Sequence, residues 1–315
     1  MKWAPGYLVD RAQFFYTLAR RGEAIHQILS STYRDPLLAA EKAADPKTIT
    51  PYGFTAFSQA DEDGILEEIF RRIGTTNRQF FEFGCGDGVE NNSTYLIFTG
   101  WKGLWMDGNP DFANTIGKGF KSYIDSGALR MKSAFITCEN INDLIREAAI
   151  PEEVDMMSID IDGNDYWVWQ KLESVAPMIV IVEYNSIFGP DLAVTIPYDP
   201  KFVRHQAHYS GQFWGASLQA LAFLAGRKEY SLVGCNSAGN NAYFVRNNKI
   251  GELNVLSPQQ AFVDARFRDS RDEKGNLNQL TGAERFRAIA ALSVYDVRQN
   301  KIAPLQALQG APIPS

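Results

Sequence analysis

Blocks of hydrophobic and polar residues alternate along the middle of the chain and predict strands and helices in turn. Short runs of β-branched and aromatic residues predict strands at 80–83, 103–106, 128–136, 155–161, 178–182, 230–233 and 243–245. Amphipathic segments predict helices at 91–98, 111–117, 141–149, 166–175 and 216–224, and another that starts with Ser58 as its N-cap and ends at Gly74. Unbroken apolar strands separated by helices are typical of a parallel sheet buried on both faces.

The last two strands lie on either side of the polar segment C-N-S-A-G-N-N, which predicts an antiparallel hairpin. We therefore expect an α/β fold for residues 51–249, with a Rossmann-like, doubly wound, seven-stranded, mostly parallel sheet that ends in this hairpin. Residues 1–50 predict an N-terminal helical extension with an amphipathic helix at 13–31. Residues 250–315 predict a C-terminal helical extension with helices at 257–268 and 283–292.

Composition narrows the possible classes of protein. Of the 315 residues, 45% are hydrophobic and 22% are charged, which is ordinary for a globular protein. The formal charge of −6 argues against a nucleic-acid-binding surface. The sequence has no run long enough for a membrane span and no apolar signal-peptide segment, so we expect a cytoplasmic protein. The N-terminal helix is expected to cover the core or a subunit partner, which leaves a homo-oligomer open.

The segment F-F-E-F-G-C-G-D-G, residues 80–88, predicts a strand that runs into a glycine turn and then a helix. Gly84, Gly86 and Gly88 carry no Cβ, so the backbone N–H groups of this turn can approach a ligand closely. Asp107 ends the next strand, where an acid is placed to bind both hydroxyls of a ribose. Glu82 before the turn and Asp107 after it indicate a nucleoside-cofactor pocket at the carboxyl edge of the sheet.

A second polar cluster follows two later strands. The segment D-I-D-G-N-D contains Asp160 and Asp162, and Glu183 and Asn185 end the neighbouring strand. Such an all-oxygen set suits Mg²⁺ or Mn²⁺, which would hold a substrate diol and lower the pKa of its hydroxyl. The alternative is that Asp162 or Asp165 caps the following helix, while Glu183 binds substrate directly.

The loop at 187–214 contains His205 and His208, and a neutral imidazole is a suitable base for a substrate hydroxyl. His208 is the favoured candidate because Tyr209 and Gly211 follow it; ordinary polar loop histidines are the alternative. Tyr184 and Trp214 are candidate walls for the substrate. The candidate catalytic residues are His208, Asp160 and Glu183, and the candidate substrate-binding residues are Tyr184, Asn185, His205 and Trp214.

These motifs together resemble the class I S-adenosylmethionine-dependent methyltransferases. S-Q-A-D-E-D-G-I-L and I-D-I-D-G resemble the FkbM-like members, which methylate hydroxyls of sugars and natural products. The resemblance implies an O-methyltransferase acting on a saccharide, a nucleotide-sugar, or a glycosylated natural product or polysaccharide precursor. It implies that S-adenosylmethionine is held by Gln59, Glu82, Gly84, Gly86, Gly88, Asp107, Asn109, Ala134, Phe135 and Asp160. Of these, Gln59 would close over the methionine tail, Ala134 and Phe135 would lie near the adenine, and Asp160 would face the methionine amine or the reacting centre.

Two other classes of protein remain open. An NAD-dependent sugar oxidoreductase would use a similar fold, but its G-x-G-x-x-G motif requires a glycine where Val89 stands. A non-catalytic nucleoside-binding protein would keep the same pocket without turnover.

Overall fold

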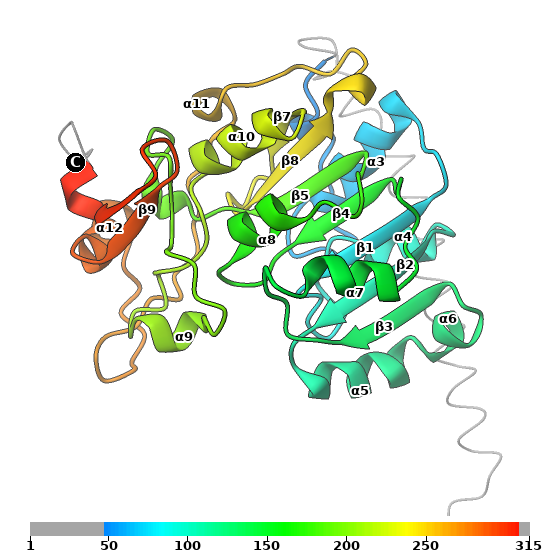
Figure 1. Cartoon of the computed structure of the whole chain (residues 1–315), viewed down its shortest axis with the longest axis horizontal. Helices are drawn as coiled ribbons and strands as arrows, with labels where there is room; N and C mark the ends of the chain where they lie inside the picture. Colours follow the sequence, from blue (N-terminus) through cyan, green and yellow to red (C-terminus); the bar gives the residue numbers. More distant parts are fainter. Residues whose placement is uncertain (1–46, 309–315) are drawn as a thin grey trace, which may run out of the picture.

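The computed structural model describes residues 47–308 (Figure 1). The helix predicted at 13–31, and most of the predicted N-terminal extension, lie outside these residues. The described chain begins with the 3₁₀ helix η2 (Thr50–Tyr52), which precedes the first long helix, α3 (Glu62–Ile73).

The core is a seven-stranded sheet with the order β3-β2-β1-β4-β5-β8-β7. Its strands are β1 (Gln79–Phe83), β2 (Lys102–Asp107), β3 (Leu129–Ser133), β4 (Met156–Ile159), β5 (Ile179–Glu183), β7 (Tyr230–Cys235) and β8 (Asn241–Arg246). The pairs among β1 to β5 are parallel, whereas β8 is antiparallel to both of its neighbours. The predicted α/β fold with its terminal antiparallel hairpin is therefore confirmed.

Helices cover both faces of this sheet (Figure 1). One face packs against α3, α4 (Thr94–Phe98) and α5 (Pro110–Gly119), and α6 (Lys121–Asp125) follows α5. The other face packs against α7 (Ile141–Glu147), α8 (Asp165–Lys171) and α10 (Leu218–Arg227). Neighbouring residues of β1 divide between the two faces: Phe80 packs on the first, and Phe81 and Phe83 pack on the second. Since both faces are covered, the strand ends are where a ligand can reach the sheet.

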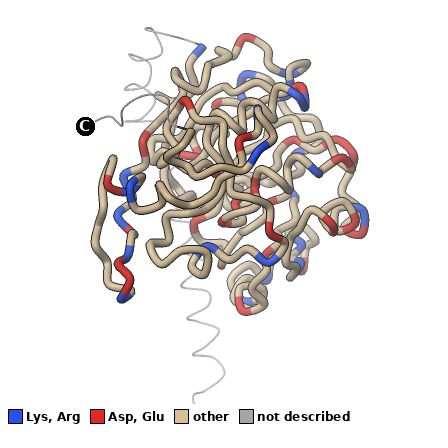
Figure 2. Tube along the Cα trace, turned by 60° about the vertical axis from the view of Figure 1, so that its left-hand side comes forward, with Lys and Arg blue, Asp and Glu red and all other residues tan. Residues whose placement is uncertain are grey.

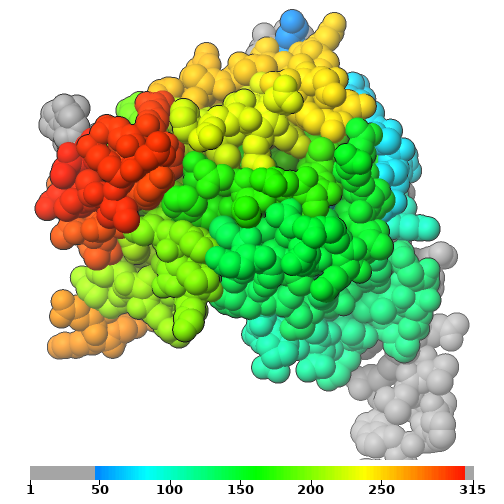
Figure 3. Space-filling view, viewed as in Figure 1, coloured from blue at the N-terminus to red at the C-terminus, as the bar shows by residue number. Residues whose placement is uncertain are grey.

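The loop after β5 and the C-terminal segment build a second, smaller unit beside the core, seen as the yellow-green, orange and red surface in Figure 3. The loop contributes η3 (Ser186–Phe188), β6 (Val194–Thr195) and α9 (Arg204–Ala207). After β8 and η4 (Asn247–Lys249), the C-terminal segment contributes α11 (Pro258–Ala261), α12 (Gly282–Ile289), β9 (Ser293–Asp296), β10 (Lys301–Pro304) and η5 (Leu305–Leu308). Strands β10, β9 and β6 form a three-stranded sheet, and Ile187, Phe188, Phe286 and Ile289 share one apolar cluster with them.

The helix predicted at 257–268 is wrong for most of its length, because only Pro258–Ala261 is helical. Beyond it the backbone extends and bonds to the core: Val263 O accepts from the Tyr184 hydroxyl at 2.7 Å, and Ala265 N donates to Ser186 Oγ at 3.0 Å. These contacts to the end of β5 replace the intrahelical bonds that the sequence pattern predicts. They also bring residues 263–265 to the edge of the sheet where the polar clusters lie.

Acidic and basic residues are interspersed along the described chain (Figure 2). Among the described helices, none combines the length and hydrophobicity that a bilayer crossing requires.

Candidate active site

Two adjoining cavities open at the carboxyl ends of β1, β2, β4 and β5. The larger, which we call the main cavity, has a volume of about 640 Å³, in the range of small-molecule sites. The smaller, the glycine-side cavity, has about 330 Å³. Both are lined by Gln59, Gly84, Gly86, Phe112 and Asp160. The sequence analysis expected a pocket at this edge, and the main cavity lies there.

The three glycines of the turn after β1 all have positive φ, but they serve different purposes. A Cβ on Gly84 would lie 1.5 Å from the carbonyl oxygen of Asp160, so this glycine lets β1 and the end of β4 approach. A Cβ on Gly88 would lie 2.7 Å from the Trp105 ring, and Gly88 lines neither cavity. Only at Gly86 would a Cβ meet nothing within 4 Å. Of the three, Gly86 alone leaves room for a ligand, while the other two make room for the protein itself.

Asp107, at the end of β2, is fixed by two backbone N–H groups. Its Oδ2 accepts from Gly86 N at 2.9 Å, and its Oδ1 accepts from Asn109 N at 2.8 Å. Each carboxylate oxygen has a further lone pair, and the side chain lines the main cavity. Asn109 also lines this cavity, and its side chain caps α5 by accepting from Asp111 N at 3.0 Å. The acid is thereby oriented to accept hydrogen bonds from a vicinal diol.

Ala134 and Phe135 follow β3 and line the main cavity on the far side of Asp107. Phe135 is 49% exposed, which is unusual for a phenylalanine and leaves a ring face available to a flat ligand. Phe112, from the first turns of α5, lines the same cavity and was not singled out by the sequence analysis. The lining of the main cavity therefore includes phenylalanine rings as well as carboxylates.

Glu82, the acid before the glycine turn, is buried within the protein and bonds the segment that leads into α4. Its carboxylate accepts from Asn92 N at 2.9 Å, from Ser93 N at 3.1 Å, from Asn91 Nδ2 at 3.1 Å, and from the Ser93 hydroxyl. Burial raises its pKa to about 7, although the bonds from Ser93 and Asn92 oppose this shift. Glu82 lines the glycine-side cavity, but both of its oxygens already accept hydrogen bonds from the protein. The structure gives it the role of holding the turn in place.

Gln59 lies on a loop that side chains from the first turn of α3 hold in place through hydrogen bonds. Asp63 Oδ2 accepts from the backbone N–H groups of residues 56, 57 and 58 at 2.7 to 3.0 Å. Glu62 Oε2 accepts from Ala60 N at 2.8 Å, while Glu62 Oε1 accepts from Asn236 and Asn241 in the hairpin region. Gln59 is thus held over both cavities, and its Oε1 accepts from Asn240 Nδ2 at 3.3 Å. The predicted N-cap at Ser58 is wrong: Asp61 is the N-cap residue, and Ser58 belongs to this clamped loop.

Three carboxylates meet where β4 and β5 end. Asp160, Asp162 and Glu183 each offer an oxygen within 4.8 Å of the others. Burial, and then the mutual repulsion of the carboxylates, raises the pKa of Asp160 and of Glu183 well above their ordinary values. Glu183 Oε2 is buried and has no hydrogen-bond partner. Asp165 does not belong to this cluster. Its carboxylate accepts hydrogen bonds from Ile161 N and Gly163 N at the start of α8.

Arg204 of α9 is the cation beside this acid cluster. Its Nη1 lies 2.7 Å from Asp162 Oδ1, its Nη2 lies 3.0 Å from Asp269 Oδ2, and its guanidinium stacks 4.6 Å from the centre of the Trp214 ring. Burial lowers the pKa of Arg204, but the attraction of Glu183 and Asp162 outweighs it, and the pKa is raised. The sequence offered no signal for this residue, because its partners are 42 and 65 positions away.

The two loop histidines lie in different surroundings. His205 is exposed and lines the mouth of the main cavity. His208 lines neither cavity; its Nδ1 lies 2.7 Å from Ser210 Oγ, and its ring stacks against Tyr209. Burial lowers the pKa of His208. The structure thus does not bring the favoured candidate base to the acid cluster, because the turn at Ser210 directs its ring elsewhere.

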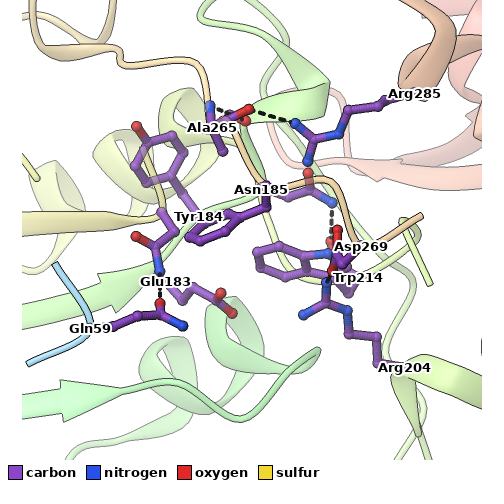
Figure 4. Close-up of a pocket in the computed structure, with 12 residues that line it drawn as sticks. Gln59, Glu183, Tyr184, Asn185, Arg204, Trp214, Ala265, Asp269 and Arg285 are labelled. Carbon is purple, nitrogen blue, oxygen red and sulfur yellow. Dashed lines mark hydrogen bonds and ion pairs between the residues drawn. The ribbon is translucent and has the colours of Figure 1, made fainter. Parts of the chain in front are cut away.

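A third space, the inner pocket, adjoins the main cavity behind Glu183. It has a volume of about 110 Å³ and includes Tyr184, Asn185 and Trp214, three of the predicted substrate residues (Figure 4). Asn185 is occupied by the protein, since its Nδ2 donates to Gln212 O and Trp214 O and its Oδ1 accepts from Ile187 N. The Tyr184 hydroxyl bonds to Val263. Trp214 differs, because its Nε1 is buried and has no partner.

No protein-family model matches the sequence, and no curated protein matches it significantly. Among solved structures, an O-methyltransferase from Bacillus cereus in complex with SAH has a TM-score of 0.41 and 15% identity, over 70% of this chain and 95% of that one. A putative O-methyltransferase from Klebsiella pneumoniae has a TM-score of 0.40 and 12% identity, over 70% of this chain and 94% of that one. At these scores and identities, the similarities say nothing about activity or substrate.

Proposed function

We propose that this protein is an S-adenosylmethionine-dependent O-methyltransferase whose acceptor is a hydroxyl of a saccharide, a nucleotide-sugar or a related glycosylated precursor. One observation carries the proposal: Asp107 is fixed against Gly86 N at the wall of a cavity of about 640 Å³. An acid at the end of the second strand and an open glycine after the first together suit an adenosine ribose. The strand order, which is typical of the Rossmann-like methyltransferase fold, supports the same proposal.

Each part of the donor has a group that fits it. Asp107 would accept from the two ribose hydroxyls, and Phe112 and Phe135 would contact the adenine faces. The methionine tail would extend past Gly86 toward the glycine-side cavity, beneath Gln59. Bound there, the sulfonium supplies an electrophilic methyl group. Asp160, which lines both cavities, would face the donor at its reacting end.

The acceptor hydroxyl would lie at the acid cluster, between the main cavity and the inner pocket. The raised pKa values of Asp160 and Glu183 make each carboxylate a stronger base than an ordinary one, which suits a proton acceptor. The unpartnered Glu183 Oε2 would take the hydroxyl proton. Most of the rate would come from holding oxygen, methyl and sulfur in line, since orientation is the main requirement of such a displacement.

Binding and turnover test this proposal in sequence. Adenosylhomocysteine at about 100 times its dissociation constant should stabilise the protein by about 2.7 kcal/mol, while NADH should leave the melting temperature unchanged. Methyl transfer from labelled S-adenosylmethionine to a panel of sugar nucleotides and acidic sugars then identifies the acceptor. Stabilisation by NADH alone would favour the oxidoreductase class, and adenosylhomocysteine binding with no transfer to any acceptor would favour a non-catalytic binding protein.

We also propose that the acid cluster takes a divalent cation, Mg²⁺ or Mn²⁺. Three carboxylates face a single guanidinium, that of Arg204, and Glu183 Oε2 lacks a partner, so the donor set suits a hard cation. Such an ion would use Glu183 Oε2 as a ligand, so it is the alternative to proton transfer to that oxygen, and it would activate the acceptor hydroxyl by lowering its pKa.

Titration calorimetry with Mn²⁺ tests the cation site without reference to turnover. The variant Asp162→Asn is expected to weaken Mn²⁺ binding about tenfold, since it removes one of the carboxylate ligands. Asp143→Asn is the matched control, because Asp143 is also an exposed carboxylate paired with an arginine, Arg146, but lies outside the cluster. Equal Mn²⁺ affinity in the wild type and the Asp162 variant would reject this site.

A further inference from the structure

Arg285 of α12 is a buried cation without a carboxylate partner. The residue is 5% exposed, and within the described chain no acid lies at ion-pair distance from it. Its Nε donates to Gln212 Oε1 at 2.9 Å, and its Nη1 donates to the carbonyl oxygen of Ala265 at 2.8 Å. Both acceptors are neutral. A buried charge is costly unless an opposite charge compensates it, and the Arg285 guanidinium lacks a negatively charged partner.

The nearby acids compensate this charge only in part: Asp264 and Asp269 attract it without pairing with it, and burial outweighs them and lowers the pKa of Arg285. Asp269 Oδ2 is paired with Arg204, and Asp269 Oδ1 accepts from Gln212 Nε2 at 3.1 Å. Asp264 is exposed on the surface. Arginine remains protonated in proteins, so Arg285 keeps its charge inside the pocket wall. The charge is therefore available to a group that enters from the pocket.

The inner pocket shows where such a group would sit. In Figure 4, Arg285 and Trp214 lie on the side of the inner pocket opposite Glu183, with Asn185 between them. Trp214 Nε1 is a buried donor with no hydrogen-bond partner. A volume of about 110 Å³ holds a small polar group but not a whole sugar ring with its substituents. The pocket therefore offers two donors and space for one anionic group.

We infer that the inner pocket is an acceptor subsite that binds one anionic group, a carboxylate or a phosphate, through the Arg285 guanidinium and Trp214 Nε1. This inference rests on the proposed function, because the inner pocket and the main cavity share Gln59, Glu183 and Arg204. An acceptor held by its anion at Arg285 would place a nearby hydroxyl at Glu183. The acceptor class is thus an acidic sugar or a sugar phosphate.

The loop arginines gave no comparable site. Arg266, Arg268 and Arg271 are exposed, and Arg271 donates to the carbonyl oxygen of Gly275 within its own loop. They behave as solvated surface residues. The proposed anion subsite instead uses Arg285, which is buried and belongs to α12.

Titration calorimetry with inorganic phosphate and with acetate, at constant ionic strength set by chloride, tests the anion subsite. We expect saturable binding of at least one of the two anions to the wild-type protein, and the preferred anion identifies a phosphate or a carboxylate acceptor. Arg285→Met should weaken that binding at least tenfold, because a charge-assisted hydrogen bond is lost. Arg285→Lys should retain part of it. Arg287→Met is the matched control, since Arg287 is exposed on the same helix.

Trp214→Phe provides a second variant should Arg285→Met fail to fold. It removes the unpartnered Nε1 and keeps an aromatic ring for Arg204, and we expect about fivefold weaker anion binding. If neither anion binds the wild type better than chloride does, or if the Arg285 and Arg287 variants bind alike, the subsite is overturned. Adenosylhomocysteine is titrated into the same samples: its failure to bind would reject the methyltransferase proposal while leaving the anion result intact.

Discussion

Replacing Asp107 with alanine is expected to weaken adenosylhomocysteine binding about 100-fold, which corresponds to about 2.7 kcal/mol. The charged carboxylate would accept from two ribose hydroxyls, and it also holds Gly86 N at 2.9 Å and Asn109 N at 2.8 Å. The variant therefore loses the ligand bonds and the orientation of the glycine turn together. Isothermal titration of adenosylhomocysteine into both proteins measures the effect.

Asp111→Ala is the control for this measurement, because Asp111 is an exposed acid in the first turn of α5 and lines neither cavity. Its affinity for adenosylhomocysteine should equal that of the wild type. If the Asp107 variant binds within threefold of the wild type, the ribose does not lie against this carboxylate, and the proposed donor orientation is wrong.

Replacing Gly84 with alanine is expected to lower the free energy of unfolding by about 3 kcal/mol or more. The new Cβ would lie 1.5 Å from the backbone carbonyl oxygen of Asp160, and the residue has a φ of +72°. Backbone on both sides prevents relief by a side-chain rotation, so strands β1 and β4 must move apart. Denaturant unfolding of the variant measures the loss.

Gly86→Ala separates this packing requirement from the ligand requirement. A Cβ there meets nothing within 4 Å, and only the φ of +56° opposes it, at a cost of about 1 kcal/mol. The Gly86 variant should stay nearly as stable as the wild type while its affinity for adenosylhomocysteine falls. Equal stability of the two variants would contradict the distinct roles assigned to these glycines.

The core fold could be predicted from the sequence because its signals are local. The β-branched run of β5 and the paired phenylalanines of β1 are buried on both faces, so their composition alone indicates central strands. The three-stranded sheet could not be predicted in this way. Strand β6 has two residues, and β10 is largely exposed and ends in Pro304, so neither carries a period-two pattern.

The placement of the residues that we assign to the donor could be predicted, whereas the placement of those that we assign to the acceptor could not. Asp107 and the glycine turn lie at strand ends, where topology brings them together whatever the loops do. Arg204 and Arg285 reach the site from helices of the second unit, and their partners are far away in sequence. His208 looked suitable by residue type, but the direction of its ring depends on a hydrogen bond to Ser210 that no pattern encodes.

Apart from Gln59, the inner pocket is built from residues between Glu183 and Arg285. The glycine-side cavity is built mostly from residues 82–92, with Gln59, Phe112, Asp160 and Asn241. The two halves of the site thus come from different stretches of chain joined mainly by β5. Under the proposed function, substitutions in the distal segment would change recognition of the acceptor and leave the glycine turn and Asp107 unaltered. A lineage carrying this architecture could acquire new specificities by remodelling α12 and its flanking loops.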